Sequence, residues 1–335
     1  MDFTTAVVAV LAAGVLAQWL AWRLRLPAIL FLLVAGAIAG PWLGLLRPHE
    51  QFGHALEPII SLCVAVILFE GGLNLELHKL RDAALGVRRL IYFGIPLSFM
   101  FGLLCARYIG DLSWPVSVVF GAIIVVTGPT VVNPLLRHAM LNQRTASFLR
   151  WEGSVNDPVG ALLGVLLLEF FVSYAGNISG ISHALRGVGV AIGTAIVLGA
   201  GFGYGTGRLF QRGWVPEYLK SPFVLVLVLA AYAAADAAQS SAGLLTVTVM
   251  GIVMGNMGLP SIQEMRRFKE YISLLLIAIV FILLTAGLQP RSLERLDWHA
   301  VALLFSIIFL VRPAMVWLAT LGAGVSVKER LLIGW

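Results

Sequence analysis

Long apolar runs are the feature that most constrains what this chain can fold into. Stretches of about 20 apolar residues recur along the sequence, each bounded by charged residues, proline or glycine. A helix of that length spans the hydrocarbon core of a bilayer. Hydrophobic residues make up 59% of the chain and charged residues only 12%, about half the share typical of soluble domains. The sequence therefore predicts an all-α membrane protein and excludes an ordinary soluble enzyme.

The apolar runs predict about eleven complete transmembrane helices. Their approximate ranges are 4–22, 28–46, 58–76, 90–108, 114–137, 145–172, 181–207, 221–239, 241–259, 271–289 and 298–322. Residues 328–335 read as the approach to a twelfth helix. We therefore expect the chain to be truncated at its C-terminus.

The distribution of lysine and arginine predicts the orientation in the membrane. Loops after the odd-numbered spans carry 17 of these residues, and loops after the even-numbered spans carry 5. Basic residues concentrate on the cytoplasmic side. We expect a multi-pass protein of the cell (inner) membrane with its N-terminus outside and the loops after odd-numbered helices in the cytoplasm. The net charge of +6 is then explained by basic residues in the cytoplasmic loops. No nucleic-acid partner is expected.

An offset of 215 residues aligns two parts of the chain without a gap. The aligned segments are Gly36 with Gly251, Gly40 with Gly255, and residues 67–74 with residues 282–289. The matched spans are separated by an odd number of crossings, so the two copies would have opposite orientations. Inverted repeats build many secondary transporters. We predict repeats over about 1–172 and 221–335, the second incomplete, with a connecting helix at about 181–207.

Asp157 is the acidic residue that most directly indicates function. It lies about twelve residues into the span 145–172, between Asn156 and Pro158. A carboxylate at that depth must be paired, protonated or open to a water-filled cavity. We interpret Asp157 as an ion-binding group, with a permanently protonated acid that only stabilises packing as the structural alternative.

Glu152 lies in the same span but has a different predicted role. Five residues separate it from Asp157, which turns the two side chains about 140° apart on a helix. Arg312 lies in the middle of the span 298–322, whereas the other basic residues lie in loops or near the ends of spans. We predict a Glu152–Arg312 ion pair with Asn156 as a hydrogen-bonding neighbour; a carbonyl or a lipid headgroup is the alternative partner for Arg312.

The middle of the span 114–137 predicts a broken helix at Thr127–Thr130. Pro129 cannot donate a hydrogen bond and disfavours helix at Gly128. A break would free the Thr127 carbonyl, and such backbone is tolerated at membrane depth only against protein or a watery cavity. A structural proline kink is the alternative. No cofactor is expected, nor any metal beyond a transported cation, because no histidine or cysteine pair has ligand spacing.

Several motifs together closely resemble those of monovalent cation/proton antiporters of the CPA1 branch, the NhaP-type sodium/proton exchangers. In chain order these are ILFEGGL at 67–73, TGPT at 127–130, WEGSVNDP at 151–158, GIVMG at 251–255 and VRP at 311–313. The resemblance covers essentially the whole chain. It implies an NhaA/NhaP-like inverted-repeat fold in which a six-helix core moves against a dimerisation domain, and hence a homodimer.

The resemblance also implies roles for individual residues. Asp157 would bind either cation or proton, Glu70 and the Thr127 carbonyl would lie close to the ion, and Glu152 would pair with Arg312. Two positions depart from the family pattern: Gly128 stands where the family has aspartate, and Gly153 stands where a serine is frequent, with Ser154 one place later. We include Ser154 as a candidate ligand beside Asp157 and Asn156.

The sequence thus predicts a secondary antiporter, not an enzyme, that exchanges Na⁺ for H⁺ by competition of the two ions for Asp157. Exchange is expected to be electroneutral, because Asn156 is neutral and Gly128 removes a further carboxylate. K⁺/H⁺ exchange by the same fold is the nearest alternative, with Li⁺ a further possible ion. A cation channel and a structural membrane protein are the alternatives from other classes.

Overall fold

The computed structural model describes residues 2–75, 85–126, 143–174, 178–239, 242–259, 262–288 and 297–334. Within these ranges the regular elements are helices, and no strand occurs. They are α1 (Phe3–Leu24), α2 (Ala28–Ala37), the π-helix η1 (Ile38–Trp42), α3 (Pro48–Phe52), the 3₁₀-helix η2 (Gly53–Ala55), α4 (Leu56–Leu73), α6 (Leu85–Tyr108), α7 (Trp114–Val125), α9 (Gln143–Tyr174), α10 (Ile178–Gln211), α11 (Glu217–Ala238), α12 (Ala242–Gly255), α13 (Ile262–Ala286), α15 (Trp298–Ser306), the π-helix η3 (Ile307–Val311), α16 (Arg312–Ala319) and α17 (Val327–Gly334).

The predicted all-α membrane class is confirmed. Each predicted span overlaps at least one described helix. Six helical segments are long and apolar enough to cross a membrane, and further apolar helices in the described ranges are shorter. Helix α7 ends at Val125, and Val126 is already extended with φ −67° and ψ 126°. The helix therefore stops directly before the predicted break, while Thr127–Thr130 themselves lie outside the described residues.

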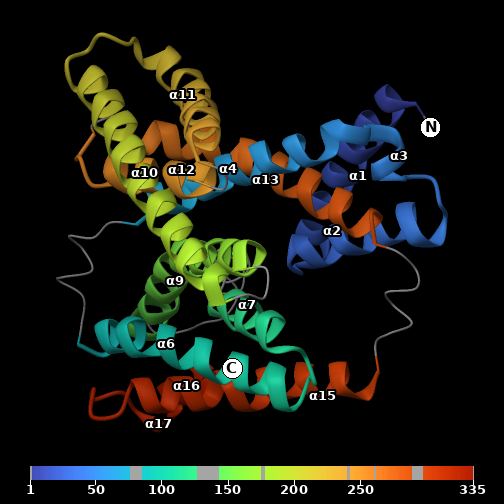
Figure 1. Ribbon diagram of the computed structural model, residues 1–335, viewed down its shortest axis with the longest axis vertical. Coiled ribbons are helices and arrows are strands. Elements are labelled where there is room, and N and C mark those ends of the chain that lie inside the picture. The colour runs from blue at the N-terminus through green and yellow to red at the C-terminus, as the bar shows by residue number, and fades with distance from the viewer. Residues whose placement is uncertain are drawn as a thin grey trace.

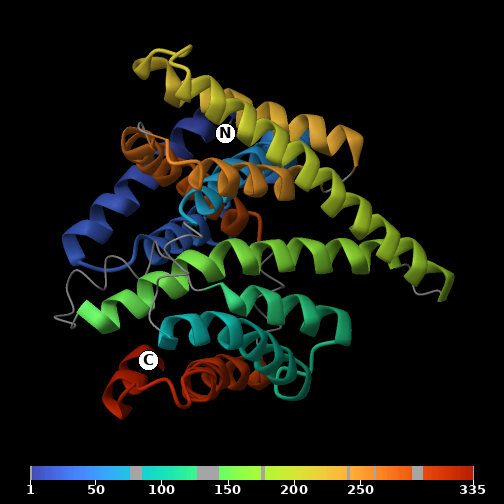
Figure 2. The same ribbon diagram turned by 90° about the vertical axis from the view of Figure 1, so that its left-hand side faces the viewer.

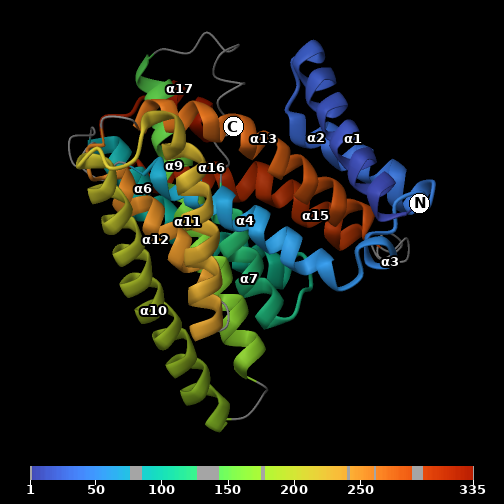
Figure 3. The ribbon, with the colours of Figure 1, turned by 90° about the horizontal axis from the view of Figure 1, so that it is seen from above.

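The helices form two groups, which occupy the upper and lower halves of Figure 1 and are also separate in Figure 2. The first, called here the α4 group, contains α1–α4 and α10–α13. The second, called the α9 group, contains α6, α7, α9 and α15–α17. Helix α9 contacts both α4 and α12 of the other group. The long helices α9 and α10 follow each other in the chain and extend side by side beyond the rest of the molecule in Figure 3.

The α4 group contains two reciprocal helix crossings. Helix α2 packs against α13, and α12 packs against α4. Glycines allow both close approaches: a Cβ atom at Gly36 would lie 2.8 Å from Thr285 Cβ, and one at Gly255 would lie 2.5 Å from the Leu73 carbonyl oxygen. The offset of 215 residues aligns Gly36 with Gly251 and Gly40 with Gly255, and therefore α2 with α12 and α4 with α13. Such reciprocal packing is the arrangement expected of an inverted repeat and supports the prediction of one.

The glycines of α10 alternate between two environments. A Cβ atom at Gly199 would lie 2.6 Å from the Thr246 carbonyl oxygen of α12, and one at Gly203 would lie 2.9 Å from that of Met250. Nothing lies within 4 Å of the corresponding position at Gly201 or Gly205. The sequence alone did not distinguish the glycines of α10 that face α12 from those that face away from it.

Replacing Gly199 with alanine should therefore lower the stability of the protein. Its Cβ would contact backbone that cannot move without shifting α12, a cost of about 1–3 kcal/mol for overpacking. Gly205→Ala is the matched control, because it adds the same methyl group to open space and improves helix propensity. Thermal unfolding in detergent should give a lower Tm for Gly199→Ala alone. Equal Tm values for the two variants would contradict this packing.

Candidate functional site

Glu152 and Arg312 form a bidentate ion pair that joins α9 to α16. Arg312 Nη2 lies 3.0 Å from Glu152 Oε2, and Arg312 Nη1 donates to Glu152 Oε1. The Glu152 side chain is 1% exposed and that of Arg312 is 26% exposed. Arg312 Nη2 also donates to the Ile333 carbonyl oxygen at 3.3 Å. The pair thus ties three helices of the α9 group together.

The local sequence explains the position of Arg312. The π-helix η3 ends at Val311, directly before Arg312 and Pro313. Proline has no N–H to continue an α-helical pattern, and a wider π turn accommodates such an interruption. Arg312 then becomes the first residue of α16. No pattern in the sequence had indicated this π turn.

Asn156 lies one helical turn beyond Glu152 on α9 and is 1% exposed. Its Oδ1 atom has no hydrogen-bond partner among the described residues. This oxygen takes no part in the Glu152–Arg312 pair, and the neighbour role of Asn156 stays a prediction. An unpaired buried carbonyl oxygen costs about 1–3 kcal/mol, and it is an acceptor that a cation or a water molecule can use.

The remaining residues predicted for the ion site are only partly described. Asp157 and Ser154 belong to α9, which continues as a helix through Pro158, but their side chains lie outside the described part of the structure. Thr127, Gly128 and Pro129 lie outside the described residues altogether. The proposed ligand set around Asp157 and the helix break therefore stay predictions.

Glu70 lies near the C-terminal end of α4 and faces α13. Its Oε2 atom accepts a hydrogen bond from Ser273 Oγ. The two side chains line a cavity of about 30 Å³ between α4, α11 and α13. Ser221 of α11 also lines this cavity. None of the residues lining this cavity comes from α9. The sequence analysis missed Ser221 and Ser273, because one hydroxyl in an apolar run does not show which neighbour it faces.

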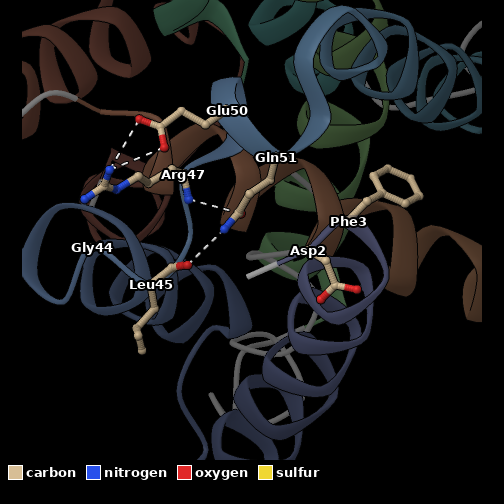
Figure 4. Close-up of a pocket in the computed structure, with 7 residues that line it drawn as sticks. All are labelled: Asp2, Phe3, Gly44, Leu45, Arg47, Glu50 and Gln51. Atoms are coloured by element: carbon tan, nitrogen blue, oxygen red, sulfur yellow. Dashed lines mark hydrogen bonds and ion pairs between the residues drawn. The ribbon is translucent and has the colours of Figure 1, made fainter.

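A recess of about 440 Å³ lies apart from all these residues. Figure 4 shows it between the start of α1 and the segment before α3. Arg47 is held there by Glu50 at 3.3 Å and by the side chain of Gln51. These polar groups already satisfy one another at an open surface, so the recess is not the candidate ion site.

Apolar helices around a buried ion pair and an unpaired buried amide oxygen define a polytopic helical membrane protein with a polar centre. Comparison with known proteins identifies the family within this class. A model of the transmembrane sodium/hydrogen exchanger family matches residues 6–335. The chain belongs to this family.

Individual relatives agree with that assignment. The chain is 30% identical over 331 residues to the K(+)/H(+) antiporter NhaP2 of Shewanella sp. (strain ANA-3), a match covering 97% of this chain and 56% of the relative. It is 26% identical to the Na(+)/H(+) antiporter 1 of Methanocaldococcus jannaschii, covering 96% of this chain and 76% of that protein. The chain thus spans about half the length of the NhaP2 relatives.

A solved structure shares the fold. The sodium proton antiporter MjNhaP1 from Methanocaldococcus jannaschii superimposes with a TM-score of 0.81 at 25% sequence identity, covering 100% of this chain and 82% of that one. The resemblance seen in the sequence motifs is therefore confirmed at the level of family and fold.

Glu152 and Arg312 should show strong energetic coupling. Either neutral variant, Glu152→Gln or Arg312→Gln, strands a buried charge at a cost of about 3–5 kcal/mol. The double variant should lose less stability than the sum of the single variants. Thermal unfolding of all four proteins measures this coupling. The exposed pair of Arg107 and Asp111, 3.3 Å apart, is the control, with an expected coupling below about 1 kcal/mol. Additive losses at Glu152 and Arg312 would show that the pair contributes no coupling.

Proposed function

We propose that the protein is a secondary antiporter that exchanges Na⁺ for H⁺ across the cell membrane, with Asp157 as the residue for which the two ions compete. The observation that carries the proposal is the environment of α9. Asn156, which precedes Asp157 in α9, has a buried amide oxygen with no partner among the described residues, and one turn earlier Glu152 is neutralised by Arg312. Membership of the sodium/hydrogen exchanger family supports the same reaction.

The proposed mechanism needs one carboxyl group that binds either a proton or a cation but not both. A carboxylate at membrane depth is costly to leave charged, and either a proton or a monovalent cation neutralises it. Since Glu152 is paired with Arg312, it does not compete with Asp157 for the cation. Ser154 and the Thr127 carbonyl are proposed as further oxygen ligands, with Glu70 as a nearby carboxylate.

Transport then follows from alternating access around a fixed site. We propose that the α9 group carries Asp157 and moves against the α4 group, which provides the contact in a homodimer. The N-terminus is placed outside the cell by the lysine and arginine distribution. No covalent chemistry is involved, so the protein is a transporter and not an enzyme.

K⁺ is the second candidate ion, and a specific observation favours it. Relatives that are 26–30% identical to this chain are named K(+)/H(+) antiporters, whereas the M. jannaschii relative, which is 26% identical, and its solved structure are named for sodium. The same carboxylate can serve either ion, since selectivity depends on the other oxygen ligands.

Asp157→Asn should abolish exchange while the protein stays folded, because the site loses its titrating group. The measurement uses the purified protein in vesicles with a trapped pH dye and successive additions of Na⁺, K⁺ and Li⁺. Asp236→Asn on α11 is the control, since that acid is exposed and exchange should persist. Cation-driven proton movement in Asp157→Asn vesicles would refute the mechanism. Flux that does not saturate and is not coupled to protons would indicate a channel.

Exchange should be electroneutral, since Asp157 alone trades one proton for one cation. The neighbouring Asn156 is neutral, and Gly128 supplies no second carboxylate. The test clamps the vesicle voltage with K⁺ and valinomycin and drives exchange with Na⁺. The steady-state pH gradient should not depend on the imposed voltage. A gradient that shifts with voltage would exclude one-for-one exchange and indicate Glu70 as a second carrier.

A further inference from the structure

Two arginines, one in the last turn of α10 and one directly after it, lie over aromatic rings. The Cζ atom of Arg208 lies 5.2 Å from the ring centre of Tyr204, and Arg208 Nε donates to the Tyr204 hydroxyl at 2.8 Å. The Cζ atom of Arg212 lies 5.6 Å from the ring centre of Trp214. The Arg212 N–H donates to the Arg208 carbonyl oxygen at 3.0 Å, so the helical turn extends to Arg212 and the two arginines lie on one side. Both side chains are exposed, and their stacking on rings restricts their orientation.

The positive charge of these arginines is uncompensated within the described residues. Neither Arg208 nor Arg212 makes an ion pair there. The nearest acid along the chain, Glu217, lies 2.5 Å from Lys220 and is neutralised by it. Arg107 offers a contrast, because it lies over Trp114 in the same way but is paired with Asp111. The end of α10 therefore presents two positive charges without counter-charges.

An exposed apolar strip leads along α10 to these charges. Ile196 and Val197 are 53% and 70% exposed, and Tyr204 is 52% exposed. Between them Gly201 and Gly205 leave the helix surface without side chains. Figure 1 shows that the turn between α10 and α11 lies at the edge of the molecule. The highly exposed aromatic rings of Trp214 and Tyr218 flank it, as aromatic side chains do at the level of lipid headgroups.

We propose that this surface binds an acidic phospholipid. Its phosphate would lie between the guanidinium groups of Arg208 and Arg212, and an acyl chain would follow the strip from Tyr204 toward Ile196. Guanidinium groups hold phosphate through charge-assisted hydrogen bonds, and anionic lipids attract basic clusters at the membrane boundary. The loop after α10 is cytoplasmic in the proposed orientation, so the lipid would come from the cytoplasmic leaflet.

Charge complementarity favours a lipid over a second copy of the chain on this surface. An isologous contact through the same surface would bring the arginines of both copies together, and like charges in contact are unfavourable. A phosphate headgroup supplies the missing negative charge, and its acyl chain covers the adjoining apolar strip. A lipid therefore satisfies both parts of the surface.

The test measures lipid binding in two independent ways. Native mass spectrometry counts phosphatidylglycerol molecules retained by the protein, and thermal unfolding gives the Tm shift on adding phosphatidylglycerol compared with phosphatidylcholine. The variant Arg208→Gln/Arg212→Gln should need about tenfold more phosphatidylglycerol for half of the Tm shift. Arg107→Gln, which removes a guanidinium from the same kind of aromatic contact, should respond like the unaltered protein. The variant Arg208→Lys/Arg212→Lys keeps the charge and should retain part of the response.

Several results would overturn the proposal. One is an unchanged lipid response in the Arg208→Gln/Arg212→Gln variant, and another is an equal loss in Arg107→Gln. A change from dimer to monomer in that double variant without any lipid dependence would assign the surface to a protein contact. Adding inorganic phosphate to the protein in phosphatidylcholine should not shift its Tm. If inorganic phosphate shifted the Tm as much as phosphatidylglycerol does, a lipid site would be excluded. None of these readouts depends on ion exchange, so they are independent of the proposed antiport.

Discussion

The ion pair of Glu152 and Arg312 fixes how the central helix of the α9 group is oriented. Neither charge can be stranded in a low-dielectric environment without a large penalty, so α9 and α16 are held together wherever the rest of the protein moves. Because Glu152 must face Arg312, the rotation of α9 about its own axis is set. Asn156 then lies on nearly the same side of the helix as Glu152, since the two are four positions apart. For Asp157 the helical spacing predicts an angle of about 140° from Glu152, so we expect the pair to leave Asp157 without contact to Arg312.

Close contacts at glycines join the helices within each group. In the α4 group, Gly36, Gly251 and Gly255 join the crossing helices. In the α9 group, a Cβ atom at Gly121 would lie 2.8 Å from the Phe99 carbonyl oxygen, and Gly86 packs against Phe148. None of these contacts crosses from one group to the other. Such contacts define the register between helices, since a shift of even one residue would place a side chain against backbone.

The sequence predicted well those features that depend on one helix at a time. Apolar runs indicated the positions of the helices. Arg312, the basic residue in the middle of a span, and the position of Glu152 in α9 together indicated an ion pair across 160 residues of sequence. Other features depend on which helices meet. The hydrogen bond from Ser273 to Glu70 joins α13 to α4, and no local pattern reveals such a partner. The π turn before Arg312 was not predicted either, because Pro313 indicates an interruption of the helix but not whether a π turn, a kink or a break results.

The boundary between the two groups has a different character from their interiors. Leu75 and Ile252, from the α4 group, pack into the apolar cluster formed by α6, α9 and α16. Leu162, Val165 and Leu166 of α9 pack in turn against α10, α11 and α12. Aliphatic side chains can exchange one neighbour for another at little cost because dispersion is not directional, whereas glycine crossings and buried ion pairs cannot. Relative movement of two parts of this chain would therefore occur where α9 lies on α4 and α12. Asp157 belongs to the helix on one side of that boundary. In the proposed mechanism, movement there would change which side of the membrane its site faces without breaking the pair of Glu152 and Arg312.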